Sequence, residues 1–157
     1  RIGFWDSSAS ALRHLTWTNL LAVLGIETGT WTPTFAGATT AGTYTYSVQL
    51  GRYVRVGNLA LFYFDLNCNG VTAHGTGNLR IGGQPYALQS MVGGGLATFV
   101  YSTQALPSNH AWWTFVVSSV IDVWSHKTTT GVPTQHAVDT VIQTGTRMSG
   151  VIVGQKT

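Results

Sequence analysis

Charged side chains are scarce in this sequence, making up 8% of the residues where an ordinary soluble domain has about 25%. The eight basic and five acidic residues form no run of Lys or Arg, which argues against nucleic acid as a partner. The low charge does not indicate disorder, because 44% of the residues are hydrophobic and six are tryptophan. The surface must therefore be built from Thr, Ser, Asn, Gln and backbone groups, a composition typical of all-β proteins.

Cysteine and long apolar runs are also nearly absent. Cys68 is the single cysteine, so no intrachain disulfide can form, and its position at the end of an expected strand predicts a buried structural thiol. No stretch reaches the roughly 18 apolar residues of a membrane span, and no signal peptide is visible. We therefore expect no membrane insertion.

An alternating stretch predicts the founding hairpin of an antiparallel sheet. From residue 43 to 50 the two-residue period of a half-buried strand places Tyr44, Tyr46, Val48 and Leu50 on one face and Thr43, Thr45, Ser47 and Gln49 on the other. Gly51 indicates a bulge or a close backbone approach. Gly57-Asn58 supplies a tight turn, and residues 59–66 form the returning strand, followed by a Gly/Asn/His loop at 67–77.

The returning strand is apolar on both faces, with Leu59, Leu61 and Tyr63 on one and Ala60, Phe62, Phe64 and Leu66 on the other. Antiparallel sheets normally have one wet face, so such a strand lies either in the middle of a sandwich or at a subunit interface. Residues 112–117 show the same pattern. Because large apolar patches on a monomer are uncommon, we favour a homotrimer.

The chain divides into an N-terminal segment, 1–29, and a body, 30–157. In the first we expect a short hairpin and a helix from Asn19 to Leu24, capped by Thr18 and ended by Gly25. The body predicts about eight or nine strands separated by Gly, Asn, Pro and Ser clusters, among them a strand at 138–143. The expected fold is an all-β, jelly-roll-like antiparallel β-sandwich with a hairpin and helix neck.

Spaced positions across this body carry a resemblance to a known family. Trp31-Thr-Pro33, a Gly/Thr loop, Tyr46-x-x-Gln49-x-Gly51-x-Tyr53-x-x-x-Gly57-Asn58 and the segment 77–86, Gly-Asn-Leu-Arg-Ile-Gly-Gly-Gln-Pro-Tyr, resemble the C-terminal receptor-binding and trimerisation domain of bacteriophage tail fibres and tailspikes. The neck is similar to the linker that joins a fibre shaft to its tip. The Ser149-Gly150 strand departs from the family pattern by ending without the usual aromatic residue.

The resemblance implies a role and a place for the chain. It implies a homotrimeric tip, joined to an upstream fibre shaft, on the distal tail appendage of a virion and made in the host cytoplasm. It implies attachment to the host surface without identifying the receptor, for which we expect a surface polysaccharide or lipopolysaccharide. The structural alternative is a pure trimerisation module, with recognition elsewhere on the fibre.

Catalytic and metal sites are poorly supported by the sequence. Only Asp6, Glu27, Asp65, Asp122 and Asp139 are available for the carboxyl pair of a glycosidase, and no nucleophile elbow or dinucleotide motif is present. The histidines, His14, His74, His110, His126 and His136, do not fall at metal-ligand spacing. We expect no enzyme activity, no cofactor and no metal, with a glycan-cleaving enzyme as the less favoured alternative.

Sugar binding needs flat aromatic surface together with amides or hydroxyls. The segment 107–113 offers these at a loop-to-strand junction, which makes Asn109, His110, Trp112 and Trp113 the predicted glycan-binding residues. Adjacent residues on a strand point to opposite faces, so one tryptophan can be core and the other exposed; the alternative is that both are buried. Tyr86, Tyr101 and Trp124 are secondary candidates, whereas Trp31 and Tyr53 are expected to be structural.

Overall fold

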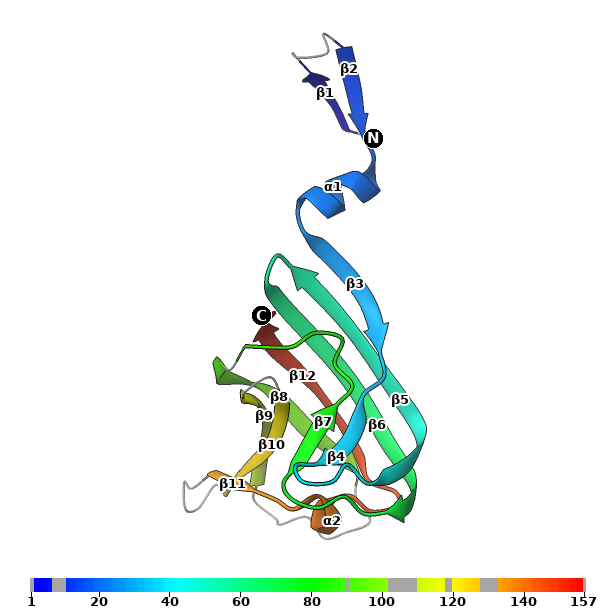
Figure 1. Ribbon diagram of the computed structural model, residues 1–157, viewed down its shortest axis with the longest axis vertical. Helices are drawn as coiled ribbons and strands as arrows, with labels where there is room; N and C mark the ends of the chain where they lie inside the picture. The colour runs from blue at the N-terminus through cyan, green and yellow to red at the C-terminus, as the bar shows by residue number, and fades with distance from the viewer. Residues whose placement is uncertain are drawn as a thin grey trace.

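The computed structural model describes residues 2–6, 11–89, 91–101, 110–117, 120–127 and 133–156. A slender neck stands on one end of a β-sandwich (Figure 1). In the neck, β1 (Ile2–Asp6) pairs antiparallel with β2 (Ala11–Leu15), and α1 (Trp17–Val23) leads into the body. The expected hairpin and helix are both present, and Gly25, at φ 64°, ends the helix as predicted.

The cap of this helix differs from the prediction. Thr16, not Thr18, is the N-cap, and its Oγ1 accepts a hydrogen bond from the Asn19 backbone N–H at 3.2 Å. Thr18 lies inside the first turn, so that prediction was wrong by two residues. Both threonines have a hydroxyl that can cap a helix. Thr16 is the cap because the N–H three residues after it, that of Asn19, lies in the first turn, where it has no helical acceptor and bonds to the Thr16 hydroxyl instead.

The body is one antiparallel sheet of ten strands in the described residues, in the order β3-β5-β6-β12-β8-β9-β10-β7-β4, with β11 added on β10. The strands are β3 (Ile26–Trp31), β4 (Thr34–Gly37), β5 (Thr43–Val56), β6 (Leu59–Ala73), β7 (Leu79–Gly82), β8 (Met91–Tyr101), β9 (His110–Val117), β10 (Val120–Lys127), β11 (Pro133–Gln135) and β12 (Arg147–Gln155).

The sheet folds over on itself to give two layers. β3, β5, β6 and β12 form one layer; β4, β7, β9 and β10 form the other, and β8 pairs with both β12 and β9. The core between them is apolar and draws on both layers: Trp31, Phe35, Ala60, Phe62, Phe64, Leu66, Cys68, Leu79, Ile81, Leu88, Ile121, Val123, Val138, Val141, Ile142, Met148 and Ile152 are buried. The predicted all-β sandwich is confirmed, as is the burial of Cys68.

A β-bulge reverses the two faces of β5 along its length. Tyr46 pairs with Cys68 and Val48 with Asn67, so Ser47 is the extra residue and the alternation changes phase. Before the bulge the less exposed positions are the even ones, Tyr44 and Tyr46; beyond residue 50 they are the odd ones, Gly51, Tyr53 and Arg55. The predicted single face that joined Tyr44 to Leu50 was therefore wrong, because a strict period of two was assumed across the bulge.

The close backbone approach expected at Gly51 is present. A Cβ on this residue would lie 2.5 Å from the Trp31 carbonyl oxygen and 2.6 Å from its indole ring. The indole N–H of Trp31 donates to the carbonyl oxygens of Arg52 and Tyr63 at 3.3 and 3.1 Å. Trp31 is thus locked over the hairpin, in the structural role predicted for it.

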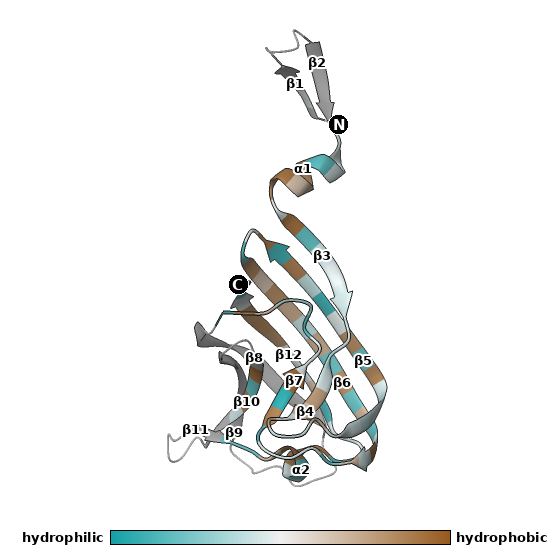
Figure 2. Ribbon diagram, viewed as in Figure 1, coloured by the Kyte–Doolittle hydropathy of each residue, from teal (hydrophilic) through white to brown (hydrophobic). Residues whose placement is uncertain are grey.

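The β6 strand has one face in the core and one face uncovered by this chain. Ala60, Phe62, Phe64 and Leu66 are fully buried. Large apolar side chains on the opposite face of β5 and β6 are 37% to 50% exposed: Leu50, Val54, Val56, Leu59, Leu61 and Tyr63. Figure 2 shows the resulting bands of apolar and polar residues along these strands. We call these six residues the outer apolar face.

Three further elements differ from the sequence expectations. β6 runs on to Ala73, through the segment expected to be a loop, and β4 lies within the expected Gly/Thr loop. Residues 138–141 form a short helix, α2 (Val138–Val141), instead of a strand. Its two valines are three residues apart, so one helical turn places both on the same side, where they are buried in the core. This packing outweighs the preference of valine for strands.

Candidate functional site

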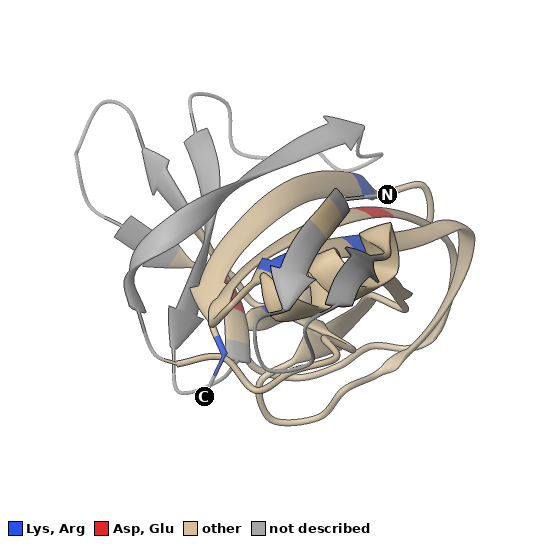
Figure 3. Cartoon of the chain, turned by 90° about the horizontal axis from the view of Figure 1, so that it is seen from above, with Lys and Arg blue, Asp and Glu red and all other residues tan. Residues whose placement is uncertain are grey.

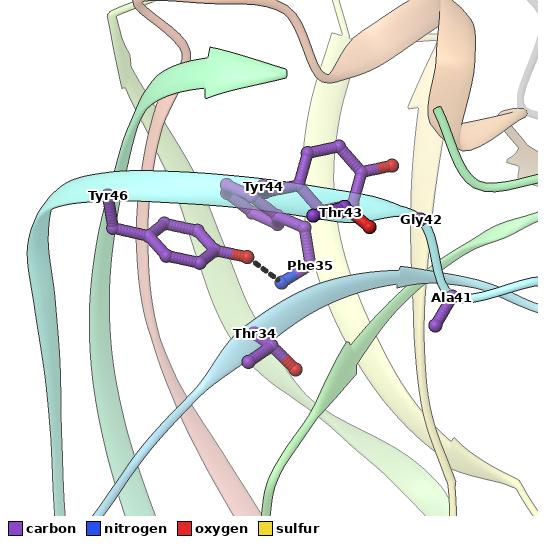
Figure 4. A pocket seen from close by; sticks show the side chains of 7 residues that line it. All are labelled: Thr34, Phe35, Ala41, Gly42, Thr43, Tyr44 and Tyr46. Atoms are coloured by element: carbon purple, nitrogen blue, oxygen red, sulfur yellow. Dashed lines mark hydrogen bonds between the residues drawn. The ribbon is translucent and has the colours of Figure 1, made fainter. Parts of the chain in front are cut away.

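A pocket of about 290 Å³ lies at the end of the sandwich away from the neck. Figure 4 shows its lining, which comes from β4, the loop after it and the start of β5: Thr34, Phe35, Ala41, Gly42, Thr43, Tyr44 and Tyr46. None of these residues was predicted as a site residue. The sequence signal was present but weak, since two tyrosines in alternation directly after a Gly/Thr loop also fit an ordinary half-buried strand.

The two tyrosines of the pocket are held by backbone groups. The Tyr46 hydroxyl accepts a hydrogen bond from the Phe35 N–H at 2.8 Å, drawn in Figure 4. The Tyr44 hydroxyl accepts one from the Gly75 N–H at 2.9 Å. Each phenol oxygen that accepts such a bond keeps its own proton to donate. Burial raises the pKa of Tyr44 and raises the pKa of Tyr46 to about 12, so both remain donors at neutral pH.

Aromatic packing and one tight backbone contact shape the pocket. The Phe35 ring lies edge-on to Tyr44 at 6.3 Å and tilted against Tyr46 at 5.8 Å, and it is buried in the core. Gly42 has φ 80°, and a Cβ on it would lie 2.4 Å from the Gly75 nitrogen. Only glycine allows the loop to pass this close, which keeps the mouth of the pocket in place.

A second polar cluster lies in the β3–β5 half of the sandwich and involves the predicted Tyr86. The hydroxyls of Tyr53 and Tyr86 both donate to Glu27 Oε1, Tyr53 at 2.8 Å, while Arg55 donates to Oε2 from Nε and from a terminal nitrogen, at 3.0 and 2.7 Å. The Tyr86 ring is also packed edge-on to Tyr53 at 5.4 Å, and the Lys156 ammonium lies 4.7 Å from its centre. We call Glu27, Tyr53, Arg55 and Tyr86 the Glu27 cluster.

The Glu27 cluster changes the acidity of its members. Hydrogen bonds from Tyr86, Arg55 and Tyr53 lower the pKa of Glu27 from 4.5 to about 2. Bonding to Tyr86 and Glu27 raises the pKa of Tyr53. The carboxylate is thus ionised and bound by three protein side chains, and the cluster joins β3, β5 and the segment before β8. Tyr53 is structural, as expected; a sugar-binding role for Tyr86 stays a prediction.

The other predicted site residues fall mainly on β9 and β10. Trp113 is opposite both Trp124 on β10 and Leu96 on β8, while Trp112 is opposite Ser125 and His110 opposite Lys127. Asn109 lies outside the described residues, and only the backbone is described for His110, Trp112, Trp113 and Tyr101. Tyr101 is opposite Arg147 on β12. The β9–β10 hairpin thus pairs Trp113 with Trp124 and carries His110 and Trp112 on the same strand as Trp113. Tyr86 instead contacts Tyr53 and Glu27 in the opposite layer.

The carboxylates considered for catalysis are held in ion pairs. Asp65 on β6 receives two hydrogen bonds from Arg147, at 3.0 and 2.6 Å, and Asp122 on β10 receives one from Arg80 at 2.7 Å. Both aspartates are buried, and they belong to opposite layers. Each of these aspartates is therefore engaged by an arginine and turned away from solvent. Gln135 also donates to Asp122, at 3.3 Å.

Other site types find little support in the described part of the chain. Within those residues no group of three or more His, Cys, Asp or Glu side chains is arranged to hold a metal ion. Figure 3 shows their charged positions dispersed, without a cluster of one sign. Of the two helices described there, neither is long and apolar enough to cross a membrane.

Comparison with known proteins places the fold. No protein-family model and no curated protein matches this chain by sequence. By fold, the chain is similar to one portion of a much longer viral-appendage protein, a tailspike. That structure is the crystal structure of the Dettilon tailspike protein, which matches with a TM-score of 0.59 and 17% identity over 81% of this chain. The match spans 23% of the tailspike chain, so it bears on the fold of one part of that protein.

Proposed function

We propose that this chain is the tip domain of a bacteriophage tail fibre or tailspike, where a homotrimer attaches the virion to a glycan on the host surface. Two independent observations support the proposal: the spaced sequence motif from Trp31 to Tyr86, and the fold shared with part of a tailspike. On this proposal the domain stands at the distal end of the tail appendage, with the neck leading to an upstream shaft. Its C-terminal place in the fibre belongs to the same proposal.

The observation that carries the trimer is the outer apolar face. Six large apolar side chains of β5 and β6 are 37% to 50% exposed and lie side by side in the register, with Val54 opposite Leu61 and Val56 opposite Leu59. Val153 and Val151 of β12 continue the row opposite Leu61 and Tyr63. Contiguous apolar patches of this kind mark interaction sites. A second and third copy of the same chain provide a matching surface without requiring another gene product.

The neck points to the same arrangement. No residue of α1 is buried in the single chain, and Trp17, Val23 and Leu24 are 53% to 77% exposed. A helix of seven residues is marginal in water when nothing packs on it. Three copies of the neck, packed around an axis, supply the missing contacts.

The oligomeric state tests the trimer directly. We expect the chain to sediment at three times its mass of 16.8 kDa at micromolar concentration. The double variant Val54→Lys, Leu61→Lys should sediment as a monomer with an unchanged β-sheet circular dichroism spectrum, because both side chains lie on the outer apolar face. Thr72→Lys, an exposed change farther along β6, is the matched control and should stay trimeric. A wild-type chain that remains monomeric at this concentration contradicts the proposed assembly.

The attachment role requires binding without cleavage. We keep Asn109, His110, Trp112 and Trp113 as the proposed sugar-binding residues, with Trp124, Tyr86 and Tyr101 as secondary ones. Binding of the trimer to purified polysaccharide and lipopolysaccharide of a susceptible host should be measurable and should fall in a Trp112→Ala, Trp113→Ala variant. A stable trimer that binds none of these glycans favours the pure trimerisation module.

Glycan cleavage is the less favoured alternative, because Asp65 and Asp122 are each bound to an arginine and lie in opposite layers. A reducing-end assay on the same glycans decides the point. Turnover that is abolished by Asp65→Asn or Asp122→Asn contradicts a purely binding role. On our proposal, the assay stays at background for the wild type and both variants.

A further inference from the structure

We propose that the pocket formed by β4 and the start of β5 binds one uncharged pyranose ring, at the exposed end of a glycan chain. This inference rests on the proposed attachment role and adds a second sugar site to it. The site is separate from the aromatic residues of β9 and β10 named above. It lies at the end of the domain opposite the neck, the end that a fibre tip presents outward (Figure 1).

The size of the pocket limits the ligand to a single ring. Its volume of about 290 Å³ is at the lower limit of the roughly 300–1,000 Å³ typical of small-molecule sites. Ala41 and Thr43 at its edge are exposed, so a ligand enters from solvent and the rest of a longer molecule stays outside. This geometry suits a terminal sugar better than an internal one.

The lining combines the two surfaces that a sugar ring presents. The rings of Phe35, Tyr44 and Tyr46 supply apolar surface for the C–H face of a pyranose. Hydroxyls of Thr34 and Thr43 add groups that both donate and accept. The phenols of Tyr44 and Tyr46 accept from the protein backbone and retain one proton each, which a sugar hydroxyl or ring oxygen can accept.

The lining also selects against charged sugars. None of the described residues that line it is Lys, Arg, Asp or Glu, so a carboxylate or amine on the ligand would lose its hydration there without gaining a counter-ion. Cys68 and Asp139 both act electrostatically on Tyr44, and Asp139, at the start of α2, is the carboxylate of the two. Its negative charge further disfavours sialic and uronic acids, whereas a neutral hexose is unaffected.

The two tyrosines are already fixed in position before any ligand arrives. Each is held by a backbone N–H from a different segment, one on β4 and one in the loop before β7, and Phe35 packs against both rings. A preorganised site loses little side-chain entropy on binding. One ring gives weak affinity by itself, and three pockets on a trimer would strengthen attachment through multivalency.

The test uses saturation-transfer NMR on the wild-type chain with methyl glycosides of glucose, galactose and mannose, and with glucuronic acid and N-acetylneuraminic acid. We expect transfer to at least one neutral glycoside and none to the two acids. Ala41→Trp places an indole at the mouth of the pocket and should weaken binding about tenfold or more. The matched control Ala22→Trp, on the exposed side of α1, should bind as the wild type does. Thr43→Val, which removes one hydroxyl at constant shape, should give a smaller loss.

Three outcomes overturn the proposal: no transfer to any neutral glycoside, transfer that Ala41→Trp leaves unchanged, or a preference for the acidic sugars. Each is distinguishable from failure of the attachment role. If the trimer still binds whole host polysaccharide, and Ala41→Trp does not change that binding, the domain attaches to glycan through another surface and only the pocket assignment is wrong.

Discussion

Two pairs of tyrosines in this domain use the same chemical group in opposite ways. Tyr53 and Tyr86 both donate to one protein carboxylate, Glu27, which is also bound by Arg55. Tyr44 and Tyr46 instead accept hydrogen bonds from backbone N–H groups and line a pocket. Three of the four tyrosines lie on the single strand β5, on either side of its bulge.

The difference between the pairs is one of proton supply. In the Glu27 cluster both phenol protons are donated to the Glu27 carboxylate, so neither is available to a ligand. At the pocket the backbone provides donors, and the phenol protons remain available to an external acceptor. A tyrosine pair in a β-sandwich is therefore better judged by what its hydroxyls already bind than by how exposed its rings are.

The largest expected effect comes from the core residue beneath the Glu27 cluster. Phe62 is fully buried and lies 6.1 and 6.5 Å from the rings of Tyr53 and Tyr86. Phe62→Ala should lower the free energy of unfolding by about 3 to 5 kcal/mol, measured by urea denaturation at constant protein concentration. Thr72→Ala, an exposed position farther along the same strand and outside the outer apolar face, should change it by less than about 1 kcal/mol. Equal losses for the two variants would contradict the core position of Phe62 on β6.

A smaller effect is expected at the pocket pair. Tyr46→Phe keeps the ring but leaves the N–H of the buried Phe35 without its acceptor, which should cost about 1 to 2 kcal/mol in urea denaturation. Tyr53→Phe is the matched change in the Glu27 cluster and should cost less, because Glu27 keeps its bonds to Arg55 and Tyr86. If Tyr53→Phe proved the more damaging of the two, the Glu27 cluster would be less redundant than its geometry indicates.

The smallest effect is the pH dependence of the Glu27 cluster. The pKa of Glu27 falls from 4.5 to about 2 on folding, so its stabilisation is fully present above pH 4.5 and is lost as the pH falls toward 2. The difference in Tm between wild type and Glu27→Gln should therefore shrink steadily over this range. Because the carboxylate is 40% exposed, 0.5 M salt should also reduce the difference at neutral pH. A difference that is constant from pH 6 to pH 2 would show that the carboxylate gains nothing from its partners.

The sequence predicted those features that depend on local repetition. The two-residue period and the Gly57-Asn58 turn predicted the β5–β6 hairpin. The apolar residues predicted on both faces of β6 are present, one set buried and the other exposed. Features set by tertiary contacts were missed. Nothing local marks the bulge at Ser47, and the buried valines of α2 carry β-propensity although the core fits them as a helical turn.

The pocket was missed for a related reason. Its lining joins β4 to the start of β5, and β4 itself lay in a segment expected to be a loop. The pattern of Tyr44 and Tyr46 predicted their shared face but not the backbone groups that their hydroxyls bind. Those partners, Phe35 and Gly75, are 11 and 31 residues away in the chain.

Because Ser47 is an extra residue in β5, the number of residues in this strand decides which side chains face the core. The identity of the residue at position 47 matters less. Deleting Ser47 would restore an unbroken repeat of two and turn Leu50, Arg52 and Val54 toward the interior, with Gly51, Tyr53 and Arg55 outside. Substitutions on either side of this point can accumulate separately, since each half of the strand keeps its own phase. A one-residue insertion or deletion would instead exchange the core-facing residues in this half of β5 for residues of the outer apolar face in a single step.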